Sequence, residues 1–455
     1  MTSPELDDPT DTPADRAHLG ALLVSMLKIG TIGFGGGSAL IPVMEKELVR
    51  DRGFLGEGAY TLHTVIANIT PGALPVKLAA LAGGRAHGPL ASLLAPLAVA
   101  LPGALATVGL VAAFNLLGPG AVRFVEFAAV GITAFIIVLL AHYITKVMRS
   151  GGPRTPAYLA IMVAAWLATG ANGLIRMVGV LVGQEWEPAL PQLSAVGLVV
   201  AALVSIGVFS VVRRPPGVAA GPTGMAEPLP DLRAKARGLG LHVGLGVVAL
   251  VVAVVFAAAT GGELLGLVAF STVTSFGGGE AYVGVADGFF VASGLVSPAL
   301  FYGQIVPVAN ALPGPILVKV ASGIGYAFGV ELGGPGLGVV FALCAFAMSI
   351  GACCAVAILV ISAWTKVARS RFMLNLGRYI LPVICGLLLT TSVSMVLASA
   401  EIAERGGVPG GPVAWASLVA VGVMWWAQHR FRLHDLFLLG VAGATSLAVL
   451  LGVAG

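Results

Sequence analysis

Charged residues are scarce in this chain. Lys, Arg, Asp and Glu make up 10% of its 455 residues, whereas soluble domains contain about 25%. Hydrophobic residues make up 58%, and a further 63 residues are glycine. So few charges cannot cover a folded surface in water, which excludes a water-soluble enzyme. At about 20 residues per membrane helix, the composition predicts an all-α, polytopic integral membrane protein.

Cysteine is also rare. The four cysteines exclude a disulfide scaffold, and all lie in apolar stretches where a thiol usually serves as a small packing residue. Cys353 and Cys354 are adjacent, but no CxxC motif or histidine near them indicates redox or metal chemistry. The chain lacks the GxxxxGK(S/T) motif of ATP-binding loops, so ATP is not the energy source within it. We expect no cofactor, no metal site and no catalytic centre.

Apolar runs of about 20 residues define the expected membrane segments. Thirteen are found, near 19–44, 63–83, 89–114, 122–147, 157–181, 190–212, 239–261, 263–286, 302–328, 335–364, 376–398, 410–427 and 434–453. Two stretches are polar. The acidic residues 1–17 lack the basic start of a signal peptide and predict a disordered tail, and residues 213–238, rich in Pro, Gly and Arg, predict a linker.

The distribution of basic residues sets the expected orientation. Loops after even-numbered segments carry 15 Lys and Arg, and the other loops carry 6. Because cytoplasmic loops hold the excess, we expect a multi-pass protein of the cell membrane with its N-terminus in the cytoplasm. In the first odd loop, Lys46, Arg50 and Arg52 alternate with acidic residues, so a first segment that does not cross fully stays open. The net charge of +4 reflects topology and requires no nucleic-acid partner.

A repeat at a fixed spacing is the most informative feature of the sequence. The segment Phe34-Gly35-Gly36-Gly37 recurs 242 residues later as Phe276-Gly277-Gly278-Gly279. The same spacing aligns Tyr60 with Tyr302, Asn68 with Asn310, Pro71-Gly72 with Pro313-Gly314, and Lys77 with Lys319. The chain is therefore predicted to be a duplicated unit. The expected domains are the tail at 1–17, a first repeat at 18–212, a cytoplasmic linker at 213–238, a linking span at 239–262 and a second repeat at 263–455.

The number of segments between the two copies decides their relative orientation. Seven expected segments separate the two starting points, and an odd number inverts the second unit relative to the first. Inverted repeats are typical of secondary transporters, whose halves move around a site near the middle of the membrane. If one segment of each half re-enters instead of crossing, the number becomes six and the units are parallel.

The repeated glycines and prolines predict broken helices. Three consecutive glycines weaken a helix by about 1 kcal/mol each relative to alanine, and Pro-Gly interrupts it more strongly. The start of a half-helix offers free N–H groups to an anion, although close helix packing also explains such glycines. The candidate substrate-binding positions in these breaks are Gly35, Gly36, Gly37, Pro71, Gly72, Gly277, Gly278, Gly279, Pro313 and Gly314.

Lys77 and Lys319 each lie six residues after the proline of a Pro-Gly pair, within an apolar run. A lysine deep in a bilayer costs at least a few kcal/mol and is a functional candidate, unless it snorkels to the interface. Two lysines at equivalent positions bring two positive charges towards one pseudo-symmetric site, which suits a divalent anion. Asn68 and Asn310 are candidate amide donors to the same anion, although helix capping explains them equally well.

One further residue breaks the symmetry. Glu280 follows the second glycine triplet, where the first copy has Ser38. It is a candidate for coupling or gating, either by carrying a proton or by balancing a lysine.

Several motifs resemble those of the chromate ion transporter family. The segment Gly33-Phe34-Gly35-Gly36-Gly37, followed by Pro42-Val43-Met44-Glu45-Lys46-Glu47 and Arg52-Gly53-Phe54-Leu55, looks like the opening of that family. Asn68-Ile69-Thr70-Pro71-Gly72 and Pro313-Gly314-Pro315 are similar to its later motif, with Ala73 in place of the second proline in the first copy. Two fused homologous halves resemble the long-chain members, whose units have opposite orientations.

The resemblance implies export of chromate from the cytoplasm, which confers chromate resistance. Moving a dianion out of a negative-inside cell gains about 5 kcal/mol per 100 mV. Sulfate is a tetrahedral dianion of similar size, so a transporter or channel for sulfate or another inorganic anion is the alternative. An enzyme acting on lipid-phase substrates would show a nucleophile with a base, or a metal-binding set, and we find neither. The expected partners are the oxyanion and the lipid bilayer, and a homodimer stays open.

Overall fold

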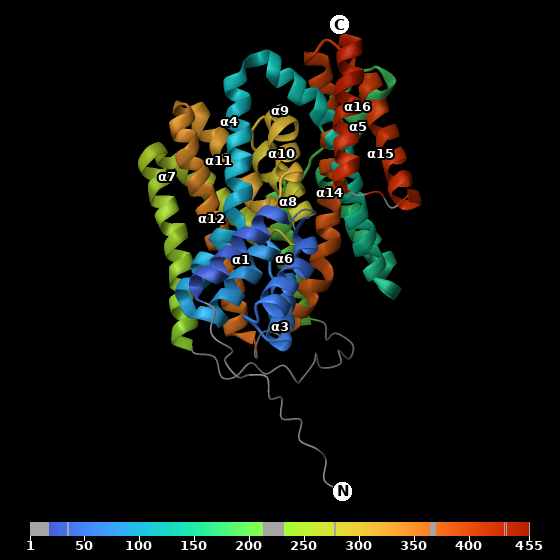
Figure 1. Cartoon of the computed structure of the whole chain (residues 1–455). Coiled ribbons are helices and arrows are strands. Elements are labelled where there is room, and N and C mark those ends of the chain that lie inside the picture. The colour runs from blue at the N-terminus through green and yellow to red at the C-terminus, as the bar shows by residue number, and fades with distance from the viewer. Residues whose placement is uncertain are drawn as a thin grey trace.

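The computed structural model describes residues 18–33, 36–212, 232–276, 279–364, 370–431, 433 and 435–454. Within these ranges the regular elements are all helical, and most of the long helices run in similar directions through one bundle (Figure 1). The expectation of an all-α, polytopic membrane fold is confirmed. The predicted tail at 1–17, and residues 213–231 of the predicted linker, lie outside the described residues.

The first half of the bundle contains α1 (Leu19–Ile32), α2 (Gly36–Glu45), a π-helical turn η1 (Lys46–Asp51), α3 (Glu57–Ile69), α4 (Leu74–Ser150), a 3-10 turn η2 (Gly152–Arg154), α5 (Thr155–Val182) and α6 (Ala195–Val212). The second half contains α7 (Leu232–Thr274), α8 (Gly279–Ala286), η3 (Asp287–Val291), α9 (Pro298–Leu300), η4 (Phe301–Ile305), α10 (Val306–Ala311), α11 (Ile316–Gly333), α12 (Pro335–Ser362), α14 (Arg371–Arg405), α15 (Gly410–Phe431) and α16 (Asp435–Ala454).

The predicted helix breaks are present at all four repeated motifs. Helix ends and the following helix starts fall at Ile32 and Gly36, Ile69 and Leu74, Thr274 and Gly279, and Ala311 and Ile316. Three of the four helix ends and starts on either side of the second copy's breaks lie 242 residues after their counterparts. The glycine triplets and the Pro-Gly pairs therefore interrupt the helices as their composition requires.

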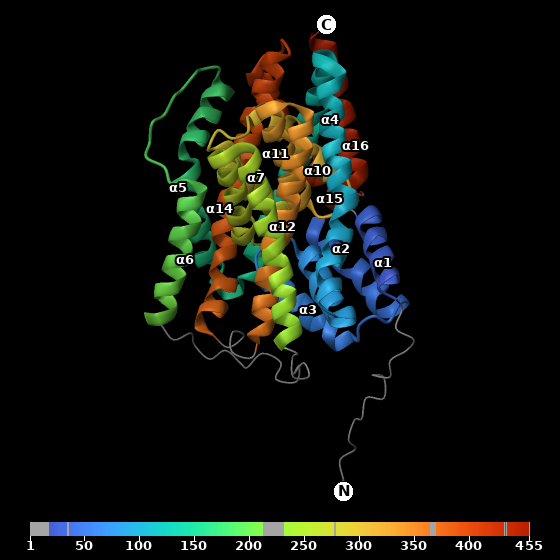
Figure 2. The same ribbon diagram turned by 90° about the vertical axis from the view of Figure 1, so that its left-hand side faces the viewer.

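Two of the longest helices contain sharp bends. In α4 the chain turns at Gly88, where φ is +80°, and in α7 it turns at Ala257 and Ala258. The bend in α7 separates an arm that packs along α12 from an arm that matches α1 at the 242-residue spacing; α7 and α12 lie side by side in Figures 1 and 2. The sequence prediction placed this boundary near residue 262, four residues too late, because the nearby Gly261 and Gly262 lie inside the second arm.

Eight helical stretches in the described ranges are long and apolar enough to cross a membrane. The expected number of thirteen crossings is not confirmed, because several expected segments consist of two short helices. At about 1.5 Å per residue, α1 with 14 residues and α3 with 13 residues reach about 20 Å, against a hydrocarbon core of about 30 Å. Neither helix crosses such a core by itself.

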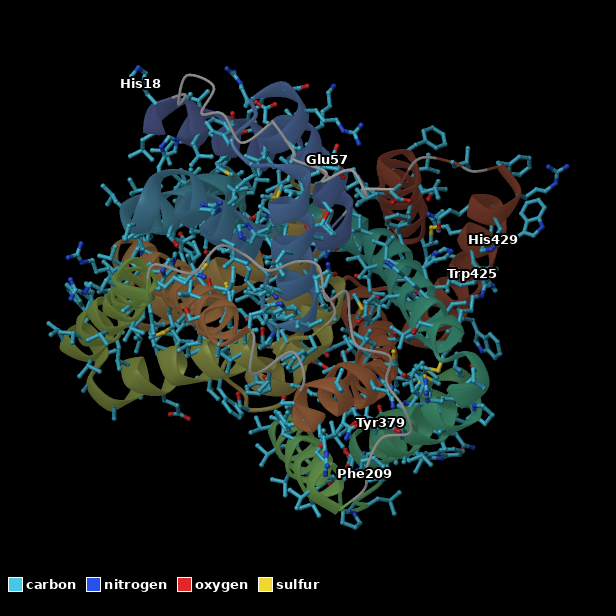
Figure 3. The ribbon with its side chains drawn as sticks, turned by 90° about the horizontal axis from the view of Figure 1, so that it is seen from below. His18, Glu57, Phe209, Tyr379, Trp425 and His429 are labelled. Carbon is cyan, nitrogen blue, oxygen red and sulfur yellow. The ribbon has the colours of Figure 1, made fainter. Side chains whose placement is uncertain are left out.

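The short helices of the two halves lie at opposite ends of the bundle. In Figure 1, α3 lies at the lower end and α9 lies in the upper half. Figure 3, seen from below, shows His18 and Glu57 on the lower side, so the chain from α1 to α3 returns to the end from which it starts. This arrangement is the one that inverted units require, and the inversion itself stays a prediction.

Equivalent positions of the two units make equivalent contacts with different chemistry. In the first unit Lys28 forms an ion pair with the buried Glu47 at 2.6 Å. At the positions 242 residues later, Phe270 and Phe289 pack with ring centroids 5.7 Å apart. The duplicated backbone therefore keeps its packing while an ion pair in one copy is replaced by an aromatic pair in the other.

Candidate functional site

The two Pro-Gly breaks share one backbone conformation. Gly72 has φ +97° and Gly314 has φ +94°, in a region that L side chains rarely adopt. Each glycine lies two residues before a new helix, α4 at Leu74 and α11 at Ile316. The Pro-Gly pair therefore ends one helix and starts the next within the protein interior.

Each break is hydrogen-bonded to the other unit. The amide of Gly72 donates to the carbonyl of Ser275 at 2.7 Å, and the amide of Gly314 donates to the carbonyl of Gly33 at 2.9 Å. Ser275 lies 242 residues after Gly33, as Gly314 does after Gly72. The same bond is made once in each direction, which is the pattern of a self-complementary contact around an approximate two-fold axis. The amides of these two glycines are thus bonded between the units.

Lys77 and Lys319 lie in the first turns of α4 and α11, and each side chain is only 1% exposed. The ammonium of Lys77 donates to the carbonyl of Thr70 and, at 2.6 Å, to that of Ala67. The ammonium of Lys319 donates to the carbonyl of Leu312, the counterpart of Thr70, at 2.5 Å. Both lysines therefore fold back over the preceding helix end, and snorkelling to an exposed surface does not explain them.

The two buried ammonium groups keep an unbalanced charge in the described part of the chain. No carboxylate among the described side chains lies within 4.0 Å of either one. An ammonium has three N–H donors, of which the carbonyls take two from Lys77 and one from Lys319. The amides of the first turn of α4 and α11 have no acceptor within their own helix. This arrangement suits an anion.

Each break also packs against a helix of the other unit. A side chain at Gly72 would collide with Cys353 of α12, and a carbon added to Gly314 would lie 3.6 Å from Gly103 of α4. The thiol of Cys354 lies 3.8 Å from the carbonyl of Val76. The two cysteines are thus packing residues of the interface between the units, as predicted, and they place sulfur atoms near Lys77.

Two hydroxyl groups beside the second glycine triplet were missed by the sequence analysis. Thr272 and Ser275 are each at most 1% exposed, and their side-chain oxygens have no hydrogen-bond partner among the described residues. Their counterparts in the first unit are Gly30 and Gly33. Polar residues next to a predicted break are the signal that identifies them, and both are further candidate ligands of an anion.

The predicted asparagines do not present their donors to the breaks. Asn68 donates to the carbonyl of Thr64 at 2.8 Å, and Asn310 donates to that of Val306 at 2.9 Å. Each bond lies within the asparagine's own helix, one turn earlier, which favours the structural interpretation of these residues.

The glycine triplets are described only in part. Gly35, Gly277 and Gly278, together with the side chain of Glu280, lie outside the described residues. Gly36 and Gly37 begin α2, and Gly279 begins α8. A carbon added to Gly279 would lie 2.9 Å from the Cβ of Ile316, the first residue of α11. The second glycine triplet and the second Pro-Gly pair therefore meet at the start of the helix that carries Lys319.

Metal ligands do not gather at this site. Among the described residues there is no group of three or more His, Cys, Asp or Glu side chains able to hold a metal ion. The chemistry that this arrangement offers is electrostatic: two buried ammonium groups, two helix starts and unpaired hydroxyl groups.

Comparison with known proteins identifies relatives of both units. Residues 20–185 and 262–447, more than three quarters of the chain, match the family model described as chromate transporter. The uncharacterized transporter YwrB of Bacillus subtilis is 37% identical over 101 residues, which cover 22% of this chain and 51% of the relative. A probable chromate transport protein of Synechococcus elongatus is 33% identical over 123 residues, which cover 27% of this chain and 31% of the relative.

The matched regions are partial on the relatives' side. The chain spans about half or less of the length of these curated relatives, and no solved structure matches it significantly. The family model, in contrast, matches both halves of the chain, in register with the duplicated motifs and with the two structurally equivalent breaks. The chain therefore belongs to the chromate transporter family, with two family units fused in one polypeptide.

Proposed function

We propose that the protein is a secondary transporter of the cell membrane that exports chromate and thereby confers chromate resistance. The observation that carries the proposal is the pair of equivalent buried lysines beside Pro-Gly breaks that are bonded between the units. A tetrahedral dianion needs two positive charges and several N–H or O–H donors in a site without water. Family membership supports the substrate, because the matching model is that of the chromate transporters.

The interface between the two units is where we expect the substrate to pass. Two inverted units that rock against each other expose a site at their interface first to one side of the membrane and then to the other. The bonds Gly72–Ser275 and Gly314–Gly33 lie at that interface, together with both lysines. Breaking one bond and keeping the other would open the site on one side only.

The membrane potential supplies the driving force for export. Moving a dianion out of a negative-inside cell gains about 5 kcal/mol per 100 mV. The orientation proposed here has the N-terminus in the cytoplasm, because the even-numbered loops carry the excess of Lys and Arg. The lower side of the bundle, with His18 and Glu57, is then the cytoplasmic side (Figure 3).

Accumulation of radiolabelled chromate in cells with and without the protein tests this function. We expect cells that express the protein to accumulate less chromate and to survive higher external concentrations. Equal accumulation at confirmed expression in the membrane would contradict export. An excess of unlabelled sulfate in the same assay separates a chromate transporter from a general carrier of tetrahedral dianions. A flux that saturates with chromate concentration separates a carrier from an open channel.

A further inference from the structure

A second polar cluster lies in the second unit, away from the lysines. Asp287, the first residue of η3, is 7% exposed. The hydroxyl of Thr391 on α14 lies 3.4 Å from its carboxylate Oδ2. The hydroxyl of Tyr302, on a side chain that is 1% exposed, lies beside the same carboxyl and has no other hydrogen-bond partner among the described residues. The carboxyl is therefore surrounded by neutral hydroxyl groups.

The helices around η3 bring no cation to this carboxyl. α6, α7, α8 and α14 pack against η3. α6 carries no ionisable residue, the buried Tyr282 of α8 shares a hydrogen bond with Ser271 of α7, and α14 contributes Thr391. Among the described side chains, no Lys, Arg or His lies within 4.0 Å of Asp287.

The nearest charged pair lies on the other side of Tyr302. Glu126 of α4 faces Gly303, the residue that follows this tyrosine, and it lies 4.0 Å from Arg405 of α14. Arg405 is thus already associated with another carboxylate. Asp287 has no such partner.

The first unit has the same two residue types with the opposite electrostatic arrangement. Glu45 and Tyr60 lie 242 residues before Asp287 and Tyr302. Glu45 forms an ion pair with Arg50 at 2.7 Å, and both side chains are at least one-third exposed. The duplication has therefore left a neutralised, solvated carboxylate in one unit and a buried carboxyl without a cation in the other.

The helix that carries Asp287 starts at the substrate site. Asp287 lies eight residues after Gly279, or about 12 Å along α8 and η3. Gly279 packs against Ile316 at the start of α11, whose first turn carries Lys319. A movement of this break to admit or release an anion moves α8, and with it the surroundings of Asp287.

We propose that Asp287, with Tyr302 and Thr391, is the proton-binding site that couples oxyanion transport to the proton gradient. Burying an ionised carboxylate without a partner is unfavourable, so in this arrangement the carboxyl takes a proton from water and an O–H bond forms on one of its oxygens. When the movement of α8 exposes it to water on the other side, that O–H bond breaks and the proton leaves. This inference rests on the proposed function, because the proton is coupled to the same oxyanion.

The test uses the purified full-length chain in liposomes with the membrane potential clamped at zero. Chromate flux is measured with and without a pH difference of one unit, and proton movement is followed with a pH-sensitive dye. For one proton per anion, the wild-type protein shifts the final chromate ratio about tenfold per pH unit. We expect Asp287→Asn to keep the exchange of labelled for unlabelled chromate and to lose both the tenfold shift and the proton signal.

Two matched variants complete the experiment. Glu45→Gln, at the equivalent position of the first unit, is expected to behave like the wild-type protein. A wild-type flux that ignores the pH difference overturns the coupling but leaves the transport of chromate standing. Unchanged coupling in Asp287→Asn overturns the assignment of the residue, as does a loss of coupling in Glu280→Gln with none in Asp287→Asn. A wild-type protein that moves no oxyanion under any gradient overturns the proposed function, and this proposal with it.

Discussion

The amide of Gly72 donates a hydrogen bond of 2.7 Å to the carbonyl of Ser275, which lies in the other unit of the duplicated chain. The symmetric counterpart joins Gly314 to Gly33 at 2.9 Å. Both bonds join a Pro-Gly break to the end of the helix that precedes a glycine triplet. The four interruptions in the helices therefore form two contacts between the units, and the lysines that follow the Pro-Gly pairs are held beside them.

Substituting Gly72 tests how closely the units must approach. Alanine at this position carries the strain of a positive φ, about 1 to 2 kcal/mol, and its Cβ also collides with Cys353. We expect Gly72→Ala to lower the free energy of unfolding by about 2 kcal/mol more than a control without the collision. The control is Gly53→Ala, where φ is +62° and no atom lies within 4 Å of the added carbon. Thermal unfolding in detergent measures both.

A second substitution separates the collision from the backbone strain. Cys353→Gly removes the atoms that an alanine at position 72 would meet, so the double variant is expected to recover the part of the stability lost to the collision. Additive effects of the two substitutions would show that the contact between the units does not limit this position.

Neutralising either lysine is expected to weaken chromate binding. A hydrogen bond to a charged group contributes about 1.5 to 3 kcal/mol, so Lys77→Gln and Lys319→Gln should each raise the Kd for chromate about 10- to 100-fold. Glutamine keeps an N–H donor for the helix carbonyls while it removes the charge. Lys146→Gln, on an exposed side chain of α4, is the control. Wild-type affinity in the double lysine variant, at normal insertion into the membrane, would refute the paired-lysine site.

The stability of the first unit is expected to depend on pH through Glu47. The hydrogen bond from Lys28 holds the pKa of Glu47 below its usual value of 4.5, although burial opposes this shift. This stabilisation is complete above the unfolded value of about 4.5 and is lost as the pH falls through the lowered folded value. We therefore expect the Tm difference between wild type and Glu47→Gln to be constant from pH 7 to 5 and to shrink below pH 4.5. A difference that grows on acidification has the wrong sign for this ion pair.

Labelling of single cysteines tests the inverted arrangement. Glu57 precedes α3 at the lower side of the bundle, and Ser297 precedes α9 at the upper side; both side chains are exposed. A membrane-impermeant maleimide added to intact cells should label Ser297→Cys and spare Glu57→Cys until the cells are opened. The four native cysteines are buried and give a low background. Labelling of both positions from one side would establish parallel units.

The sequence predicted the helix breaks well because their causes are local. Three glycines in a row, or Pro-Gly, interrupt a helix whatever surrounds them, so the breaks near Ile32, Ile69, Thr274 and Ala311 follow from composition. The direction of the short helices does not follow from composition. An apolar run of about 26 residues such as 19–44 has the length of a crossing helix, and only the break at residues 33–36 reveals that it consists of two short ones.

Contacts between the units were beyond the reach of the sequence. The spacing of 242 aligns Gly72 with Gly314, but it does not say that each meets the helix end of the opposite unit. Lys77 and Lys319 were identified because a buried charge is conspicuous in an apolar run. Ser275 and Asp287 were not, because a hydroxyl or a carboxyl near a helix end usually faces water, and their burial depends on the packing of α14 and the second unit.

The most direct test of the account is to locate the bound anion itself. Chromium scatters anomalously, so a crystal of the full-length protein grown with chromate gives a map in which the anion is marked by its own signal. We predict one peak at the interface between the units, within hydrogen-bond distance of the ammonium groups of Lys77 or Lys319 and beside the breaks at Gly72 and Gly314. A single occupied site elsewhere in the bundle, with both lysines still bonded to the carbonyls of the preceding helices, would contradict it.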